Sequence, residues 1–346
     1  MTAVAADAED DESEQTHPRA TTAWFGHALA ERALLDAYRG GRVPHAWLIG
    51  GPSGIGKATL AYRFARFVLV HSDPSEDAVQ AATSLAVDPA HPVARRMAAQ
   101  AQGDLLVLER TVGDTGKLRT RIAVGDVRRS VSFFGSTAGE GGWRIAIVDS
   151  VDELNKESAN ALLKVLEEPP ARALLLLVSH APGRVLPTLR SRCRLLPLRP
   201  LSGEDVVQAA AVALGRSPDE PDLRAAAEAA DGSVARALML LEGSALALRQ
   251  RVLDLLAQLP NPDKRALHAL GDALGGTEPQ ALAAFMDTIN GWLAARLSNG
   301  PSRNLAPVAA AWDKVNTAAR DVEIYNLERK PLVFAVFGWL AEASRG

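Results

Sequence analysis

Residues 51–59 read Gly-Pro-Ser-Gly-Ile-Gly-Lys-Ala-Thr, and no other segment constrains the fold as strongly. The pattern Gly-x-x-x-x-Gly-Lys is complete in Gly51, Gly56 and Lys57, with a further glycine at Gly54. An apolar run comes directly before the loop and a helical pattern directly after it, which is the order that a phosphate-binding loop requires. In such a loop the backbone N–H groups and the lysine hold the phosphates of a nucleotide. An accidental glycine turn is the weaker alternative.

One part of the usual loop is missing. The position after Lys57 is Ser or Thr in such loops, because that hydroxyl binds Mg²⁺. Here the position is Ala58. Thr59 comes one residue later, and on a helix this offset turns a side chain by about 100°. The pattern therefore predicts a loop that can hold ATP or ADP, in which a magnesium ion lacks its usual hydroxyl ligand.

Short apolar runs alternate with helical stretches in the first 200 residues. The five runs are 46–49, 105–108, 145–148, 174–178 and 195–198. This alternation is typical of a parallel sheet with helices on both faces, so we predict a three-layer α/β domain. A polar segment with several prolines, 72–103, has no clear period and is interpreted as an insertion or a mobile connection.

The strand pattern stops after Pro200, and a helical pattern continues from there almost to the C-terminus. The acidic N-terminal residues include almost no bulky side chain, which is typical of a disordered tail. We predict four segments. They are a tail at 1–20, the α/β domain at 21–200, a small helical module at 201–245 and a larger helical domain at 246–346.

Charge and cysteine content limit the function. The chain has 38 Lys and Arg against 41 Asp and Glu, so no overall basic field attracts DNA. A local basic cluster remains at Arg119, Arg121, Arg128 and Arg129. It is either a solvated face or a strip that faces DNA. The one cysteine, Cys193, excludes an internal disulfide and a cysteine-based zinc site, which suits a reducing cytoplasm. The longest apolar run, 173–178, is far too short for a membrane span.

Polar residues follow the third and fourth predicted strands. Asp149 ends the third strand and is either an acid beside Mg²⁺ or a turn residue. Many ATPases place Glu next, to orient the attacking water, but here Ser150 follows, and a serine cannot act as a carboxylate base. Ser179 and His180 follow the fourth strand. A polar group there can sense a γ-phosphate, although an ordinary loop residue is an equal alternative.

Ser191-Arg192-Cys193 stands just before the last predicted strand. An arginine here either forms a local ion pair or projects into a neighbouring subunit. Its permanent charge and planar set of donors suit the second role, because they match phosphate oxygens. Arg190 and Arg194 flank it, and these residues alone do not choose among the three.

Three stretches together resemble one family. They are the phosphate loop, the block Asn160–Pro170 (Asn-Ala-Leu-Leu-Lys-Val-Leu-Glu-Glu-Pro-Pro) and Ser191-Arg192-Cys193. In this order they are similar to the clamp-loader branch of the AAA+ ATPases, over about residues 21–245 and more loosely to the C-terminus. The resemblance implies an AAA+ RecA-like P-loop domain, a small helical lid and an all-α C-terminal collar that assembles subunits. It also implies cytoplasmic partners: the γ/τ and δ subunits, the sliding clamp through the complex, and primer-template DNA weakly or indirectly.

Within that branch, the chain departs from the subunits that hydrolyse ATP. Ala58 and Ser150 replace the metal-binding hydroxyl and the carboxylate. Segment 71–104 also lacks the four cysteines of a zinc module that the hydrolysing subunit and many non-hydrolysing members of the branch carry. Ala235 fills the family position of a second sensor arginine, with Arg236 one residue beyond. The resemblance therefore implies a stator that turns over little or no ATP and offers Arg192 to ATP in an adjacent γ/τ subunit. Apolar seams between subunits are expected at Leu253, Leu256 and Leu259, with packing inside the domain as the alternative.

Two other hypotheses stay open. The first is an active γ/τ-like ATPase, in which Thr59 and Asp149 hold Mg²⁺ in an unusual register and another acid orients water. Two lost groups weigh against it together, because the loss of a water-positioning group alone commonly costs a hundredfold or more. The second is a P-loop kinase or GTPase, in which the long helical region after Pro200 has no obvious use.

Overall fold

The computed structural model describes residues 17–111, 122, 124–135, 142–242, 244–275, 279–299, 305–325 and 327–345. Contacts divide the chain into two compact units, Met1–Ala235 and Arg236–Gly346, and each is described by itself. The predicted boundaries at 200/201 and 245/246 stay predictions. Of the predicted basic cluster, Arg119, Arg121 and the side chain of Arg128 lie outside the described residues, and Arg129 is exposed.

The first unit is built on a five-stranded parallel sheet. Its strands are β1 (Ala46–Gly50), β2 (Leu105–Glu109), β3 (Arg144–Asp149), β4 (Ala173–Ser179) and β5 (Arg194–Pro197). Their spatial order is β2-β3-β4-β1-β5. Every residue of β1 and β4 is buried, as expected for central strands covered on both faces. The predicted parallel sheet is confirmed, with each strand within one residue of its predicted run.

The register fixes which residues share the carboxyl edge of the sheet. Gly50 of β1 pairs with Ser179 of β4, and Asp149 of β3 pairs with Glu109 of β2. The phosphate loop, Ser179, Asp149 and Glu109 therefore meet at one edge. Because all the strands are parallel, the opposite edge holds the strand beginnings, including Arg194 at the start of β5.

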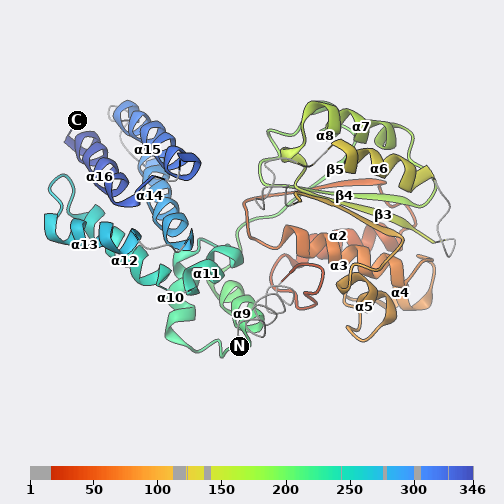
Figure 1. Ribbon diagram of the computed structural model, residues 1–346. Coiled ribbons are helices and arrows are strands. Elements are labelled where there is room, and N and C mark those ends of the chain that lie inside the picture. The colour runs from red at the N-terminus through yellow and green to blue at the C-terminus, as the bar shows by residue number, and fades with distance from the viewer. Residues whose placement is uncertain are drawn as a thin grey trace, which may run out of the picture. The chain divides into compact units, whose positions relative to one another are not determined.

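Helices cover both faces of this sheet (Figure 1). α2 (Ala28–Arg39) and α3 (Lys57–Val70) lie on one face; α6 (Val124–Gly135), α7 (Lys156–Glu167) and the short α8 (Pro187–Arg190) lie on the other. Successive side chains of a strand point to opposite faces. On β1, Trp47 and Ile49 therefore join the core beneath α2 and α3, whereas Leu48 joins the core beneath α7.

The segment interpreted as an insertion or a mobile connection is folded, which contradicts only the second of these interpretations. It contains α4 (Asp77–Ala81) and α5 (Pro92–Ala98). Val79, Leu85 and Met97 are almost fully buried and belong to the core of the first unit. Their spacing follows neither a helical nor a strand period, because two short helices and the loops around them share the burial. The sequence pattern therefore missed this packing.

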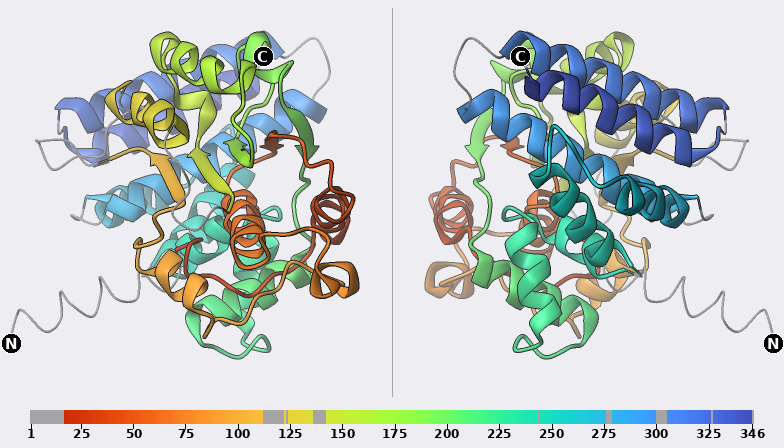
Figure 2. Two further views of the ribbon diagram at one scale, coloured as in Figure 1. Left: turned by 90° about the vertical axis from the view of Figure 1, so that its right-hand side faces the viewer. Right: turned by 90° about the vertical axis from the view of Figure 1, so that its left-hand side faces the viewer.

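Helices replace strands after Pro200, as predicted. The first unit adds α9 (Gly203–Leu214), α10 (Pro221–Ala229) and the beginning of α11 (Val234–Leu241). The second unit continues with α12 (Ala245–Ala257), α13 (Lys264–Leu274), α14 (Pro279–Asn299), α15 (Leu305–Tyr325) and α16 (Arg329–Arg345). Figure 2 shows α15 running beside α14 and α16. None of the helices in the described parts of the chain is long and apolar enough to cross a membrane.

The second unit has its own hydrophobic core, which corrects one expectation. Leu256 was expected in a seam between subunits, but it is 3% exposed within this core. Leu253 and Leu259 are partly buried and pack against the same core. Helical periodicity indicates an apolar face but does not indicate which partner covers it. These three leucines therefore support the helical unit itself.

Candidate functional site

The phosphate loop has the backbone that its glycines predict. Gly54 and Gly56 have φ angles of 74° and 94°, a region that side chains with a Cβ rarely adopt. Gly51 begins the loop directly after β1, and Gly56 is the N-cap of α3. The first amides of α3 therefore face the loop, the arrangement that binds phosphate at a helix N-terminus. The loop fits a nucleotide in this respect.

Lys57 is the buried cation of the loop. Lys57 is 3% exposed, and its Nζ donates a hydrogen bond to the carbonyl of Pro52. Burial lowers the pKa of Lys57 to about 8, although the charges of Asp149 and Asp152 act in the opposite direction. Ala58 and Thr59 follow in the first turn of α3 and are both half-buried. A methyl group thus stands where a magnesium-binding hydroxyl is usual.

Two carboxylates end neighbouring strands, and one of them, Asp149, acts on this lysine. Burial raises the pKa of Asp149 at the end of β3, while His180 and Lys57 oppose the shift. Burial also raises the pKa of Glu109 at the end of β2, and the charge of Asp149 adds to it. Sequence reasoning found Asp149 and missed Glu109. The same signal, an apolar strand that ends in an acid, marks both.

Asp152 gathers the polar groups that follow β3 and β4. The hydroxyl of Ser150 donates to its Oδ1 at 3.1 Å, and the backbone N–H of His180 donates at 3.1 Å. The hydroxyl of Ser179 also bonds to it. Burial favours a raised pKa for Asp152, but these hydrogen bonds outweigh burial and lower it. The candidate sensor Ser179 is fully buried, and it bonds to Asp152 within the chain.

An N-terminal segment also contacts the loop, and the sequence did not predict it. The predicted tail reached residue 20, whereas the structure describes a turn from His17, with Arg19 8% exposed. His27 forms a hydrogen bond of 2.9 Å through Nε2 with the carbonyl of Ile55. A Cβ added to Gly56 would lie 3.6 Å from the Trp24 ring. The indole Nε1 of Trp24 is buried without a hydrogen-bond partner among the described residues.

The start of α11 is hydrogen-bonded to the phosphate loop. The Gly54 carbonyl accepts hydrogen bonds from the backbone N–H groups of Val234 at 2.8 Å and Ala235 at 3.3 Å. Ala235, which fills the family position of the second sensor arginine, therefore contacts the loop. Arg236 forms an ion pair with Asp287 at 2.6 Å within the second unit. The described geometry gives this arginine a structural partner.

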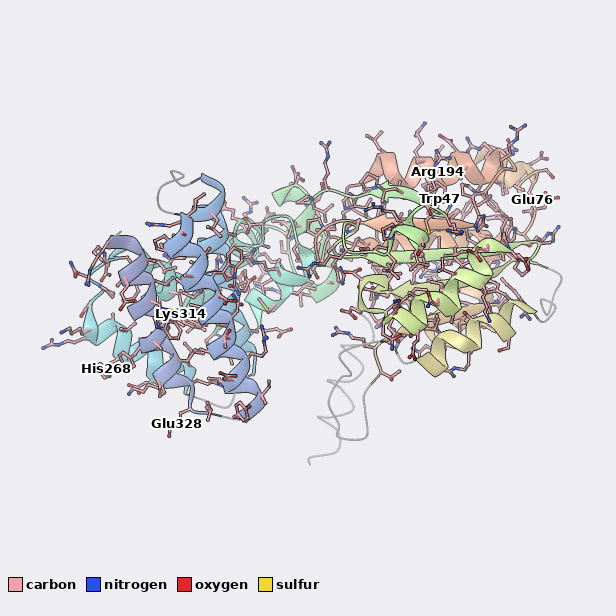
Figure 3. All side chains as sticks on the ribbon, turned by 90° about the horizontal axis from the view of Figure 1, so that it is seen from above. Trp47, Glu76, Arg194, His268, Lys314 and Glu328 are labelled. Atoms are coloured by element: carbon pink, nitrogen blue, oxygen red, sulfur yellow. The ribbon has the colours of Figure 1, made fainter. Side chains whose placement is uncertain are left out.

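Arg192 lies on a firmly held turn after α8. Leu189 is buried, and the Cys193 thiol is sufficiently buried to raise its pKa to about 12. Arg192 itself is 37% exposed, with Nη2 2.8 Å from Oε1 of Glu167 and Nη1 donating to the carbonyl of Thr188 at 2.9 Å. Arg194, by contrast, lies over the Trp47 ring, 5.2 Å from its centroid (Figure 3).

The structure brings the predicted site residues into two places. The loop, Asp149 and Ser179 meet at the carboxyl edge of the sheet. Arg192 precedes β5 and so lies at the opposite edge. The four residues of β5 alone separate the edges by about 13 Å at roughly 3.3 Å per residue. Among the described side chains, no group of three or more His, Cys, Asp or Glu is arranged to hold a metal ion.

The sheet is parallel with the order 2-3-4-1-5, a phosphate loop follows β1, and a helical module follows the sheet along the chain. These features together define a P-loop protein of the AAA+ class. The family model described as "DNA polymerase III, delta subunit" matches residues 26–202, just over half of the chain. The chain therefore belongs to this family of clamp-loader subunits.

Individual relatives agree with this family. Over 156 residues the chain is 36% identical to DNA polymerase III subunit delta′ of Pseudomonas aeruginosa, a match that covers 44% of this chain and 43% of that protein. It is 29% identical to DNA polymerase III subunit gamma of Buchnera aphidicola (subspecies Schizaphis graminum), over 63% and 56% of the two chains. The matches thus span about half the length of these relatives.

A solved structure of a DNA polymerase III gamma subunit-related protein from Thermotoga maritima is also similar in outline. It is 16% identical and covers 90% of this chain and 99% of its own. Its TM-score is 0.43, so the family membership rests on the sequence matches.

Proposed function

We propose that this chain is a largely non-hydrolysing subunit of a DNA polymerase III clamp loader. In this role it supplies Arg192 to ATP bound by a neighbouring γ/τ subunit while the sliding clamp is loaded on primed DNA. Its other partners are the δ subunit and, through the complex, the clamp and weakly the primer-template DNA. The compartment is the cytoplasm, and residues 246–346 form the assembly collar.

The position of Arg192 is the observation that carries this proposal. The residue lies at the edge of the sheet opposite to the chain's own phosphate loop, on a turn held by Leu189 and Cys193. A nucleotide in that loop is therefore out of its reach, so any triphosphate it contacts must belong to another chain. An arginine supplied to ATP in trans can raise the rate by several orders of magnitude.

The chain's own nucleotide site supports the non-hydrolysing part. Gly51, Gly54, Gly56 and Lys57 would hold the phosphates of ATP or ADP, beside Ala58, Thr59 and Asp149. The groups that cleave ATP are incomplete there, because Ser150 follows Asp149 and its hydroxyl bonds to Asp152. Ser179 bonds to the same carboxylate. Binding without turnover is the behaviour that these contacts favour.

The test is ATP turnover by the reconstituted loader. Arg192→Ala should lower turnover by about a hundredfold or more, while size-exclusion chromatography shows the assembled complex unchanged. Arg190→Ala, two residues earlier and also exposed, is the matched control and should retain turnover. Unchanged turnover with Arg192→Ala in an intact complex would reject the proposed role.

A second candidate, an active γ/τ-like ATPase, rests on Glu109. This acid lies beside Asp149 in register and could orient water in place of the missing glutamate. The isolated chain would then hydrolyse ATP on the order of once per second, and both Lys57→Ala and Glu109→Gln would abolish the activity. An isolated chain without magnesium-dependent turnover excludes this candidate.

A further inference from the structure

We propose that Glu167 is a positioning residue for Arg192, fixing the guanidinium for a neighbour's triphosphate. This inference rests on the proposed function and assigns a role to a second residue of the same surface. Its basis is the ion pair of 2.8 Å between Glu167 Oε1 and Arg192 Nη2, together with the hydrogen bond from Nη1 to the Thr188 carbonyl. One guanidinium is thus held at both terminal nitrogens by its own chain.

Glu167 stands on a rigid support. It is the last residue of α7, whose first turn is capped by the Asn155 side chain accepting from the Ser158 N–H at 2.7 Å. Leu162 and Leu166 bury the inner face of this helix against the sheet. The carboxylate therefore extends from a fixed point, and it is itself half exposed, as a group beside an approaching subunit must be.

The arginine also stands on a rigid support. Leu189 and Cys193 anchor the turn in the core, and the Ser191 hydroxyl donates to the Thr188 carbonyl at 3.2 Å. The Arg192 side chain is the long and flexible part. An arginine side chain loses rotamer freedom when it is ordered. If the side chain is already held before the subunits meet, less rotamer freedom is lost when it contacts the neighbour's triphosphate.

The ion pair does not consume the donors that phosphate needs. A guanidinium has five N–H donors, and these two contacts use one on each terminal nitrogen. Three donors, including Nε–H, stay available to phosphate oxygens. The half-exposed carboxylate is screened by solvent, so its repulsion of a triphosphate is weak. This geometry therefore favours a Glu167 that orients the guanidinium over a Glu167 that competes with phosphate for it.

The test is a double-mutant cycle in the reconstituted loader. Glu167→Ala should lower kcat about two- to fivefold, the range of an exposed ion pair, with the KM for ATP unchanged. Glu167→Gln keeps an oxygen acceptor without the charge and should fall in between. In the Arg192→Ala background, Glu167→Ala should cause no further loss, because it acts only through the arginine.

Glu168→Ala is the matched control, since Glu168 is exposed and adjacent. It should leave kcat unchanged, and thermal unfolding should show that all the variants fold. An equal loss of kcat with and without Arg192 would show a structural role and overturn the inference. So would no loss, or a rise in kcat, with Glu167→Ala. If Arg192→Ala itself has no effect, the proposed function fails first, which separates the two failures.

Discussion

Lys57 should make the stability of the free chain rise with pH, the direction opposite to that of a lysine whose pKa is raised by an ion-pair partner. The residue is 3% exposed, and burial lowers its pKa to about 8 from an ordinary value of 10.5. This difference corresponds to about 3 kcal/mol, the net free energy by which the folded site disfavours the ammonium. The charges of Asp149 and Asp152 are already included in that balance.

The sign follows from which state binds more protons. Below pH 8, Lys57 is charged in both the folded and the unfolded chain, and the folded chain carries the full cost of burying the charge. Between pH 8 and 10.5 the folded chain releases the proton while the unfolded chain keeps it. The free energy of unfolding therefore rises with pH in this window. It should gain about 1.4 kcal/mol by pH 9 and about 3 kcal/mol by pH 10.5.

The assay compares the natural chain with Lys57→Met by urea unfolding from pH 7 to pH 10.5. The methionine variant cannot lose this proton, so the difference between the two curves isolates Lys57 from tyrosines and other groups. The variant should be more stable by about 3 kcal/mol at pH 7, and the difference should vanish by pH 10.5. Parallel curves would refute the reasoning, because they would mean that Lys57 titrates alike in both states.

Two further substitutions test other parts of the first unit. Glu31→Ala should lower the free energy of unfolding, measured in urea, by about 3 kcal/mol, because it leaves the buried Arg63 without its ion-pair partner at 2.7 Å and the Leu85 N–H without its acceptor. The control is Glu76→Ala, at the more exposed pair with His71, which should cost less than about 1 kcal/mol. Equal losses of stability in the two variants would contradict this account. Gly54→Ala should cost about 1–3 kcal/mol of stability in the same assay and weaken ADP binding measured by calorimetry, because φ is 74° and the new Cβ would lie 2.8 Å from that of Ala235. The control is Gly183→Ala, in open space, which should change neither stability nor ADP binding. Unchanged stability and ADP binding in Gly54→Ala would show that the loop and α11 separate readily.

The sequence could predict those parts of the fold whose burial has a simple period. Central strands of a parallel sheet are apolar on both faces, so β1 and β4 appear as continuous apolar runs. α7 could be predicted from an apolar helical face and a cap at Asn155, which accepts from the Ser158 N–H as expected. By contrast, α4 has five residues and buries only Val79, and α5 has seven residues and buries Val93, Ala94 and Met97. Helices this short give too few apolar positions for a period to stand out in the sequence.

The candidate site shows a similar division. Local motifs predicted the phosphate loop, Asp149 and Ser179, because each follows directly from a strand. The hydrogen bonds that join Ser150, Ser179 and His180 to Asp152 link the ends of two strands and need the sheet order to be seen. The contacts of Trp24 and His27 with the loop are also long-range. Glu109 is different, since the rule that identified Asp149 would have identified it too.

Sheet topology adds one step to the argument for an assembly. The phosphate loop follows β1 and Arg192 precedes β5, so parallel strands place the two at opposite edges of one domain. For an arginine of this kind to meet a phosphate loop, the arginine edge of one subunit must face the loop edge of the next. Such a contact joins two different surfaces, and a repeated head-to-tail contact closes into a ring when its rotation permits. This chain has an intact arginine edge but an incomplete loop edge, so it can contribute to catalysis on one side only. Under the proposed function it therefore belongs beside a hydrolysing neighbour and not in a ring of its own copies.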